Sequence, residues 1–172
     1  QNPDILSEVG GYFFNGGAYD LEIAKKAYQK ALSIKPSLKG AHHQLARIAF
    51  VQKNSYIALK EVNQELKRDP SNLHSVYVRA LIYGFGNDFR RAEQDFTRVT
   101  KEAPNVWAYN DLIWVLAAQG KFKEAENIVV EAFAKLPEST PHPWLLNSAG
   151  VVYLNLGKYG EAEDALEKAK IH

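Results

Sequence analysis

The chain has 172 residues, of which 46% are hydrophobic and 24% are charged, values typical of globular proteins rather than of disordered or fibrous chains. The formal net charge is +1. Residues 1–86 contain 11 Lys and Arg against 7 Asp and Glu, and residues 87–172 contain 10 against 13. Neither half has the basic stripe that nucleic-acid binding requires. The lack of cysteine excludes disulfides and thiolate chemistry, and no apolar run of about 18 residues predicts a membrane span.

Four prolines recur along the chain with a nearly constant period of about 34 residues, and an alanine precedes each of them by the same distance. The prolines are Pro36, Pro70, Pro104 and Pro137, and the alanines are Ala24, Ala58, Ala92 and Ala125. A fixed period of this length is the signature of a helical repeat array, whose units bury their apolar faces only against their neighbours. The predicted fold is all-α, an α-solenoid.

Each period contains two amphipathic segments. The first segments are residues 5–14, 40–51, 73–85, 106–118 and 143–156. In the second segments, apolar or small residues recur at the spacing of one helical face, as at Leu21, Ala24 and Tyr28, and the proline then ends the helix. A fifth second segment contains Ala162 but stops before its proline. Ten helices in antiparallel pairs are predicted, with Asn72, Asp88 and Asn105 as N-caps.

Three of these units carry a specific set of small and aromatic residues. They are Ala80, Tyr83, Phe89, Ala92, Phe96 and Pro104 in the third, Leu112, Ala125, Ala132 and Pro137 in the fourth, and Gly150, Tyr153, Gly157, Tyr159, Ala162 and Ala169 in the fifth. This set resembles the tetratricopeptide repeat. The resemblance implies a right-handed superhelix of antiparallel helix pairs, one array over residues 1–172 with repeats at about 5–38, 39–72, 73–105, 106–142 and 143–172.

Three departures from the repeat pattern are informative. One extra residue lies around Asn15 to Ala18, and about three are inserted between Glu138 and His142, so the superhelical pitch is expected to change at both places. Glu65 stands where the family has a small buried residue, which predicts a loosened contact or a polar partner. Arg79 and Asp95 lie on the two helices of the third unit and are expected to form a structural ion pair, as in a recurring family variant.

The residues that could carry chemistry do not form a catalytic or metal-binding pattern. His42 and His43 are adjacent on a helix, so their side chains point about 100° apart and do not converge on one metal ion. His42 is expected to pack, and His43 to face the groove. Ser148 lacks the setting of a nucleophile, and Glu124 and Glu126 are expected on solvated helix faces. No enzyme activity, metal or cofactor is expected.

The resemblance implies that the first helices line a concave groove. The residues at groove positions are His43, Gln44, Arg47, His74, Tyr77, Leu81, Trp107, Asn110, Asp111, Trp114, Trp144, Asn147, Ser148 and Val151. Aromatic, arginine and amide side chains of this kind suit an extended peptide. As an alternative, Trp107 and Trp144 pack between neighbouring units and hold them together. This alternative applies less strongly to Trp114. The family's chaperone-tail clamp is not matched by Glu8, Tyr12, Gln44, His74 and Val78.

The leading hypothesis is a non-catalytic scaffold that binds a protein or extended peptide in the groove, mostly in the third to fifth units. Two alternatives stay open. In the first, the chain is the recognition or regulatory arm of a larger enzyme or membrane protein. In the second, it assembles with copies of itself through the solenoid ends, where the side chains of Tyr153, Leu156 and Leu166 are expected to be uncovered. The compartment is undetermined; a cytoplasmic location is slightly favoured, and an anchor upstream of Gln1 is compatible with the sequence.

Overall fold

The computed structural model describes residues 2–16, 19–136 and 142–170, and in these ranges it contains ten α-helices and no strand. The chain divides into two compact units, Gln1–Ile82 and Tyr83–His172, and the division falls within the fifth helix. The all-α prediction is confirmed. The prediction of one array over residues 1–172 concerns the arrangement of the two units and stays a prediction.

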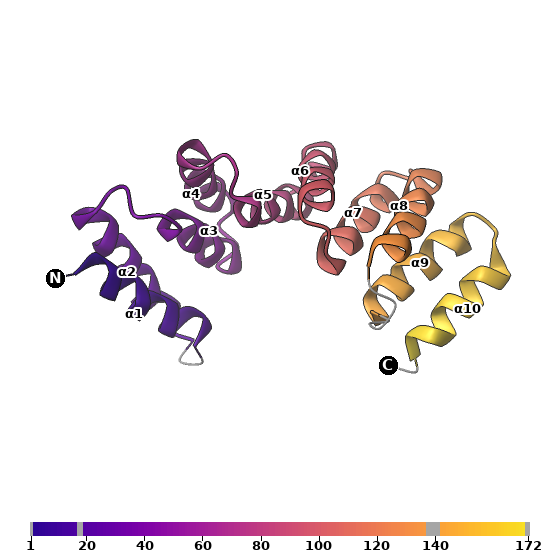
Figure 1. Ribbon diagram of the computed structural model, residues 1–172, viewed down its shortest axis with the longest axis horizontal. Helices are drawn as coiled ribbons and strands as arrows, with labels where there is room; N and C mark the ends of the chain where they lie inside the picture. Colours follow the sequence, from indigo (N-terminus) through magenta and orange to yellow (C-terminus); the bar gives the residue numbers. More distant parts are fainter. Residues whose placement is uncertain (1, 17–18, 137–141, 171–172) are drawn as a thin grey trace. The chain divides into compact units, whose positions relative to one another are not determined.

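The first unit is built from pairs of short antiparallel helices (Figure 1). Its helices are α1 (Pro3–Asn15), α2 (Leu21–Ile34), α3 (Ala41–Val51), α4 (Ser55–Arg68) and most of α5 (Leu73–Phe85). Each of α1, α2 and α3 packs against the helix that follows it. The core of α1 to α3 is formed by Phe14, Tyr28, Leu45 and Ile48 together with small alanines.

The second unit continues the same pattern with α6 (Phe89–Glu102), α7 (Val106–Ala118), α8 (Phe122–Lys135), α9 (Pro143–Asn155) and α10 (Tyr159–Lys170). Consecutive helices from α6 to α10 pack together, and α7 also contacts α9, so two first helices lie side by side (Figure 1). Phe96, Tyr109, Leu112 and Ile113 are the bulky residues at the centre of this unit, each with at most 1% of its surface exposed.

The alanines that recur with the repeat period lie in the core. Ala24, Ala58, Ala92, Ala125 and Ala162 all have an exposed fraction of 0%. Because alanine has no side chain beyond Cβ, a helix that carries it can approach its partner closely without leaving a void. The period found in the sequence is therefore a period of packing contacts.

The helix boundaries follow local capping chemistry. Asp88 and Asn105 cap α6 and α7 as predicted, each accepting a hydrogen bond from a backbone amide in the first turn, and Asn72 accepts from the amide of Ser75. In the turn that joins two helices of a pair, Gly120 and Gly157 have φ of +73° and +71°. Glycine is the residue that takes this left-handed conformation without steric cost.

Some predicted features fall outside the described residues. They are Pro137, the inserted residues 138–141 and the residues 17–18 in the first inter-helix connection.

Within the described ranges, no helix combines the length and the apolar character needed to cross a membrane.

Candidate functional site

The residues predicted for the groove fall into two sets, one in each unit. The second-unit surface consists of Trp107, Asn110, Trp144, Asn147, Ser148 and Val151, on α7 and α9. The first-unit surface consists of His43, Gln44, Arg47 and His74, on α3 and α5. Within each unit, the structure brings most of these side chains into direct contact with one another.

Two tryptophans dominate the second-unit surface. The rings of Trp107 and Trp144 lie 4.9 Å apart between centroids, with their planes inclined by 38°. They nevertheless keep 50% and 58% of their surfaces exposed. The rings therefore join α7 to α9 and together present a broad aromatic surface to solvent, and their predicted role in binding stays a prediction.

Polar groups lie one helical turn from these rings. The hydroxyl of Ser148 donates a 2.8 Å hydrogen bond to Oδ1 of Asn110, and this bond also joins α9 to α7. Nδ2 of Asn110 makes a weaker contact of 3.3 Å with Oδ1 of Asp111. Asn147 and Val151 are exposed on α9. The second-unit surface thus combines aromatic area with an exposed amide that can both donate and accept hydrogen bonds.

Trp114 has a different environment from the other two tryptophans. Its ring lies 5.3 Å from that of Phe85 and 6.2 Å from that of Phe89, between centroids. A Cβ added at Gly84 would lie 2.8 Å from the Trp114 ring, so glycine at this position leaves room for the indole. Trp114 therefore packs the end of α5 and the start of α6 against α7, and its predicted groove role stays a prediction.

Arg47 is the centre of the first-unit surface. Its guanidinium carbon lies 4.7 Å from the centroid of the Phe14 ring. Nη1 donates to the side-chain oxygen of Gln44 at 2.9 Å, and Nη2 donates to that of Asn15 at 3.3 Å. Phe14 and Asn15 were not predicted as site residues, since they belong to α1, far before Arg47 in the chain, and carry no local signal. The guanidinium is held between one aromatic ring and two neutral acceptors.

His43 lies beside this arginine and is partly buried. Its Nδ1 shares a 3.0 Å hydrogen bond with Oγ of Ser75, a buried residue of α5. The rings of His43 and His74 are 6.4 Å apart between centroids. Burial, followed by electrostatic interactions with Arg47 and His74, lowers the pKa of His43 to about 4. His43 is therefore neutral near pH 7.

Tyr77 and Leu81, also predicted for the groove, are partly buried on α5.

His42, which was expected only to pack, has an acidic partner. Its Nδ1 lies 2.6 Å from Oε2 of Glu61 on α4, and both side chains are largely buried. Glu61 occupies the place in its repeat that Asp95 occupies in the next repeat, and Asp95 is itself buried. The predicted ion pair of Asp95 with Arg79 joins residues of the two units and stays a prediction.

Glu65 has the polar partner that its unusual position predicts. Its Oε1 accepts a 2.8 Å hydrogen bond from the backbone amide of Gly40, at the start of α3. Its Oε2 is buried, with no hydrogen-bond partner among the described residues. The carboxylate therefore links α4 to the residue before α3 through a hydrogen bond.

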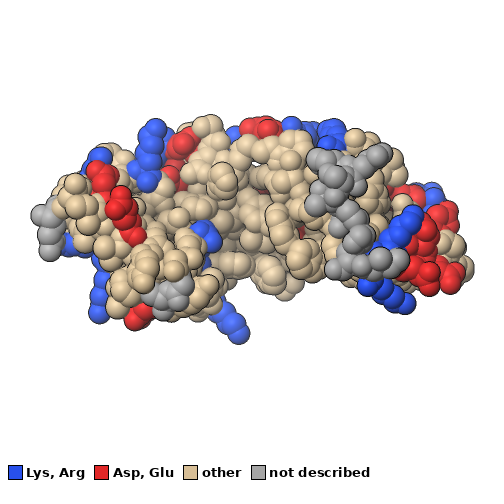
Figure 2. Space-filling view, turned by 60° about the horizontal axis from the view of Figure 1, so that its bottom comes forward, with Lys and Arg blue, Asp and Glu red and all other residues tan. Residues whose placement is uncertain are grey.

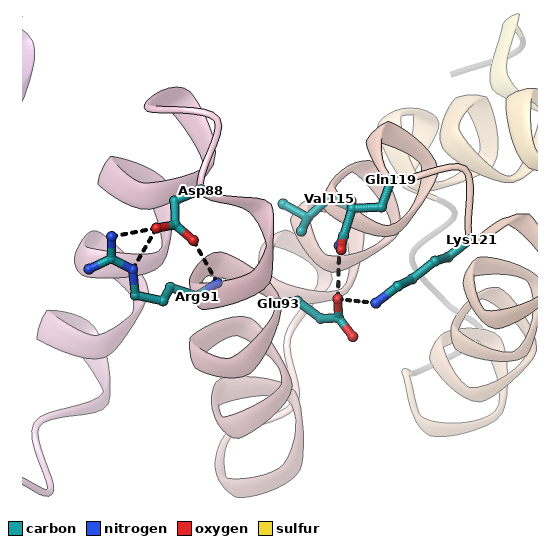
Figure 3. A network of polar contacts seen from close by, with 6 residues as sticks. All are labelled: Asp88, Arg91, Glu93, Val115, Gln119 and Lys121. Carbon is teal, nitrogen blue, oxygen red and sulfur yellow. Dashed lines mark hydrogen bonds and ion pairs between the residues drawn. The ribbon is translucent and has the colours of Figure 1, made fainter.

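Two ion pairs at equivalent places connect neighbouring repeats of the second unit. Nζ of Lys121 lies 2.7 Å from Oε2 of Glu93, which also accepts from Gln119 (Figure 3). Nζ of Lys158 lies 2.6 Å from Oε1 of Glu126. Burial raises the pKa of Glu93, but the hydrogen bonds from Lys121 and Gln119 outweigh it and hold the pKa below its ordinary value. Glu126, expected on a solvated face, thus belongs to an ion pair.

Other acidic residues of the second unit do lie on a solvated face. Figure 2 shows acidic side chains gathered where α10 lies in Figure 1, and Glu161, Glu163, Asp164 and Glu167 of this helix are exposed. Asp164 pairs with Lys168 one turn later. In the described ranges, no three His, Cys, Asp or Glu side chains are grouped so that they could hold a metal ion.

Comparison with known proteins identifies the repeat. Family models described as tetratricopeptide repeat match residues 77–143 and residues 145–170. None of the curated proteins compared with the chain matches it. Solved structures match its fold at low sequence identity.

Three of these structures illustrate the likeness. A crystal structure of MamA is 20% identical, covers 94% of this chain and 92% of its own, and has a TM-score of 0.77. PilF of Pseudomonas aeruginosa is 19% identical, with coverages of 98% and 75% and a TM-score of 0.82. YrrB, described as a TPR protein with an unusual peptide-binding site, is 20% identical, with coverages of 95% and 82% and a TM-score of 0.74. The chain belongs to the tetratricopeptide repeat family.

Proposed function

We propose that this protein is a non-catalytic scaffold that binds an extended segment of a partner protein on the second-unit surface. The observation that carries the proposal is the pair Trp107 and Trp144, whose rings are packed together and yet half exposed. Exposed apolar patches on folded proteins commonly mark interaction sites, and tryptophan is among the residues that contribute most to binding energy.

The surroundings of the two rings suit a peptide backbone. Asn147 is exposed beside them, and its amide can donate to a backbone carbonyl and accept from a backbone amide. Asn110 and Ser148 are fixed by their mutual hydrogen bond, so the polar part of the surface is largely preorganised. The likeness to YrrB, whose description names a peptide-binding site, is in keeping with a peptide ligand.

The proposal is tested by selecting peptides from a displayed random library against the intact chain and measuring their affinity by fluorescence anisotropy. Replacing both Trp107 and Trp144 by alanine is expected to weaken the selected peptides by about thirtyfold or more, the effect of losing one binding hot spot of about 2 kcal/mol. The Asn147→Ala variant is expected to weaken them less.

The matched control is the double variant Tyr159→Ala and Phe133→Ala, which removes two exposed aromatic rings from the second helices α10 and α8. It is expected to leave peptide affinity unchanged. If the tryptophan variant keeps its circular dichroism spectrum and binds the peptides as tightly as the original chain, the second-unit surface is not the binding site.

A further inference from the structure

The first unit contains an arginine without an acidic partner. Arg47 donates only to the neutral side chains of Gln44 and Asn15, and within the described ranges it forms no ion pair. A guanidinium has five N–H donors in a planar fork that matches a carboxylate. Its two observed hydrogen bonds and the Phe14 ring fix its position and leave donors for a ligand.

The acidic residues of this unit are nearly all engaged elsewhere. Residues 1–82 carry 11 Lys and Arg against 7 Asp and Glu, a formal charge of +4. Six of the seven acids have partners within the unit: Asp4 with Lys35, Asp20 with the amides at the start of α2, Glu22 with Gln52, Glu61 with His42, Glu65 with Gly40 and Asp69 with Ser71. The seventh, Glu8, is exposed on α1. The positive charge of Arg47 is thus not neutralised by the unit itself.

Two imidazoles complete the surroundings of the guanidinium. His43 is neutral near pH 7 and shares a hydrogen bond with Ser75, and the exposed ring of His74 lies next to it. A neutral imidazole has one N–H donor, and when the hydroxyl of Ser75 donates to Nδ1 of His43, the N–H at Nε2 is left to donate to an anion. An acidic ligand would meet one fixed cation and two further donor groups on α3 and α5.

We propose that Arg47, His43 and His74 form a recognition site for the side-chain carboxylate of Asp or Glu in an extended acidic segment of a partner protein. The inference rests on the proposed function in one respect, that the first-helix surfaces of this chain bind extended segments. It adds the chemical class of the segment that the first unit selects and the residues that select it.

The test uses three synthetic dodecapeptides and calorimetric titration of the intact chain at low salt, where charge interactions are least screened. The first peptide has four aspartates among glycine, alanine and leucine, and both of its ends are blocked. The second has asparagine at those four positions. The third is the asparagine peptide with a free C-terminal carboxylate.

The aspartate peptide is expected to bind about tenfold more tightly than the asparagine peptide, the effect of one charge-assisted hydrogen-bonded contact. Arg47→Gln is expected to abolish this preference, and Arg47→Lys to reduce it, because lysine keeps the charge but lacks the planar fork. The exposed His74→Gln provides a second variant that leaves the packing of Arg47 in place, and it is expected to reduce the preference as well.

Arg68→Gln is the matched control, since it removes the same charge from the exposed end of α4. It is expected to preserve the preference. If Arg68→Gln and Arg47→Gln reduce the preference for the aspartate peptide equally, the effect is one of general charge, and the proposal is overturned. If only the third peptide binds tightly, the chain recognises a C-terminal carboxylate, and the proposal is also overturned.

The two proposals fail separately. Loss of Trp107 and Trp144 tests the second-unit surface and is expected to leave the aspartate preference intact. If the library peptides bind through the tryptophans while the chain does not distinguish aspartate from asparagine, the site at Arg47 is refuted and the proposed function stands.

Discussion

The first-unit and second-unit surfaces use the same repeat positions for different side chains. Trp107 and Trp144 stand where the third repeat has His74, and Asn110 and Asn147 stand where earlier repeats have His43 and Tyr77. The first-unit surface is polar and is fixed by hydrogen bonds to Gln44, Asn15 and Ser75. The second-unit surface is aromatic and half exposed. The scaffold thus fixes where side chains stand, and their chemistry varies freely from one repeat to the next.

The largest expected effect separates scaffold from surface. Phe96→Ala on α6 removes a fully buried ring and is expected to lower the free energy of unfolding by about 3–5 kcal/mol, because it creates a cavity in the second unit. Trp144→Ala removes a larger but half-exposed ring and is expected to cost about 1 kcal/mol. Urea denaturation measures both. Similar losses in the two variants would contradict the division into scaffold and surface.

The next effect distinguishes the two surfaces by pH. The pKa of His43 is about 4 in the folded chain and 6.5 in the unfolded chain, so between these values the unfolded state binds more protons. Stability is therefore retained above pH 6.5 and is lost as the pH falls toward 4, by about 2 kcal/mol after allowance for partial exposure. Thermal unfolding of His43→Gln in the same buffers is the control. A parallel pH dependence in the variant would rule out His43 as the cause.

A smaller effect tests the aromatic contact in the second-unit surface. A double-mutant cycle of Trp107→Ala and Trp144→Ala is expected to give a coupling energy of about 0.5–1.5 kcal/mol, as for other packed aromatic pairs. Unfolding free energies of the four proteins supply the cycle. Strict additivity would mean that the two rings are independent in solution.

The smallest effect concerns the ion pairs between repeats. Glu93→Gln is expected to cost about 0.5–1 kcal/mol near pH 7, because Glu93 and Lys121 are only partly buried. Since their contact lowers the pKa of Glu93, this contribution disappears as the pH falls below the ordinary value for glutamate. The cost should also shrink at about 1 M salt, where charges are strongly screened. A cost unchanged by salt would indicate packing rather than charge.

The sequence predicted the scaffold well because its signals are periodic. The segments 73–85 and 106–118 match α5 and α7, and the alanines of the period are all fully buried. Repeats constrain one another, so five weak patterns reinforce a single prediction.

The sequence allowed the residues of the candidate site to be named, but it did not predict which residues they contact. Arg47 and His42 have partners on other helices, distant from them in the chain, and only the packed structure brings Asn15 and Glu61 to them. The environment of Trp114 was equally hidden, because its contact with Gly84 depends on how closely two helices approach. Side-chain rotamers and the distances between helices determine which of these side chains come into contact.

The central claim is that partner recognition belongs to the first helices and that the second helices are scaffold. Site-specific photo-crosslinking tests it directly, with a photoreactive phenylalanine derivative placed at Trp107 on α7, at Trp144 on α9, or at the exposed Val130 on α8. In cells of the source organism, we expect one and the same partner to be crosslinked from Trp107 and Trp144 and not from Val130. Crosslinking of the partner from Val130 alone would contradict this claim.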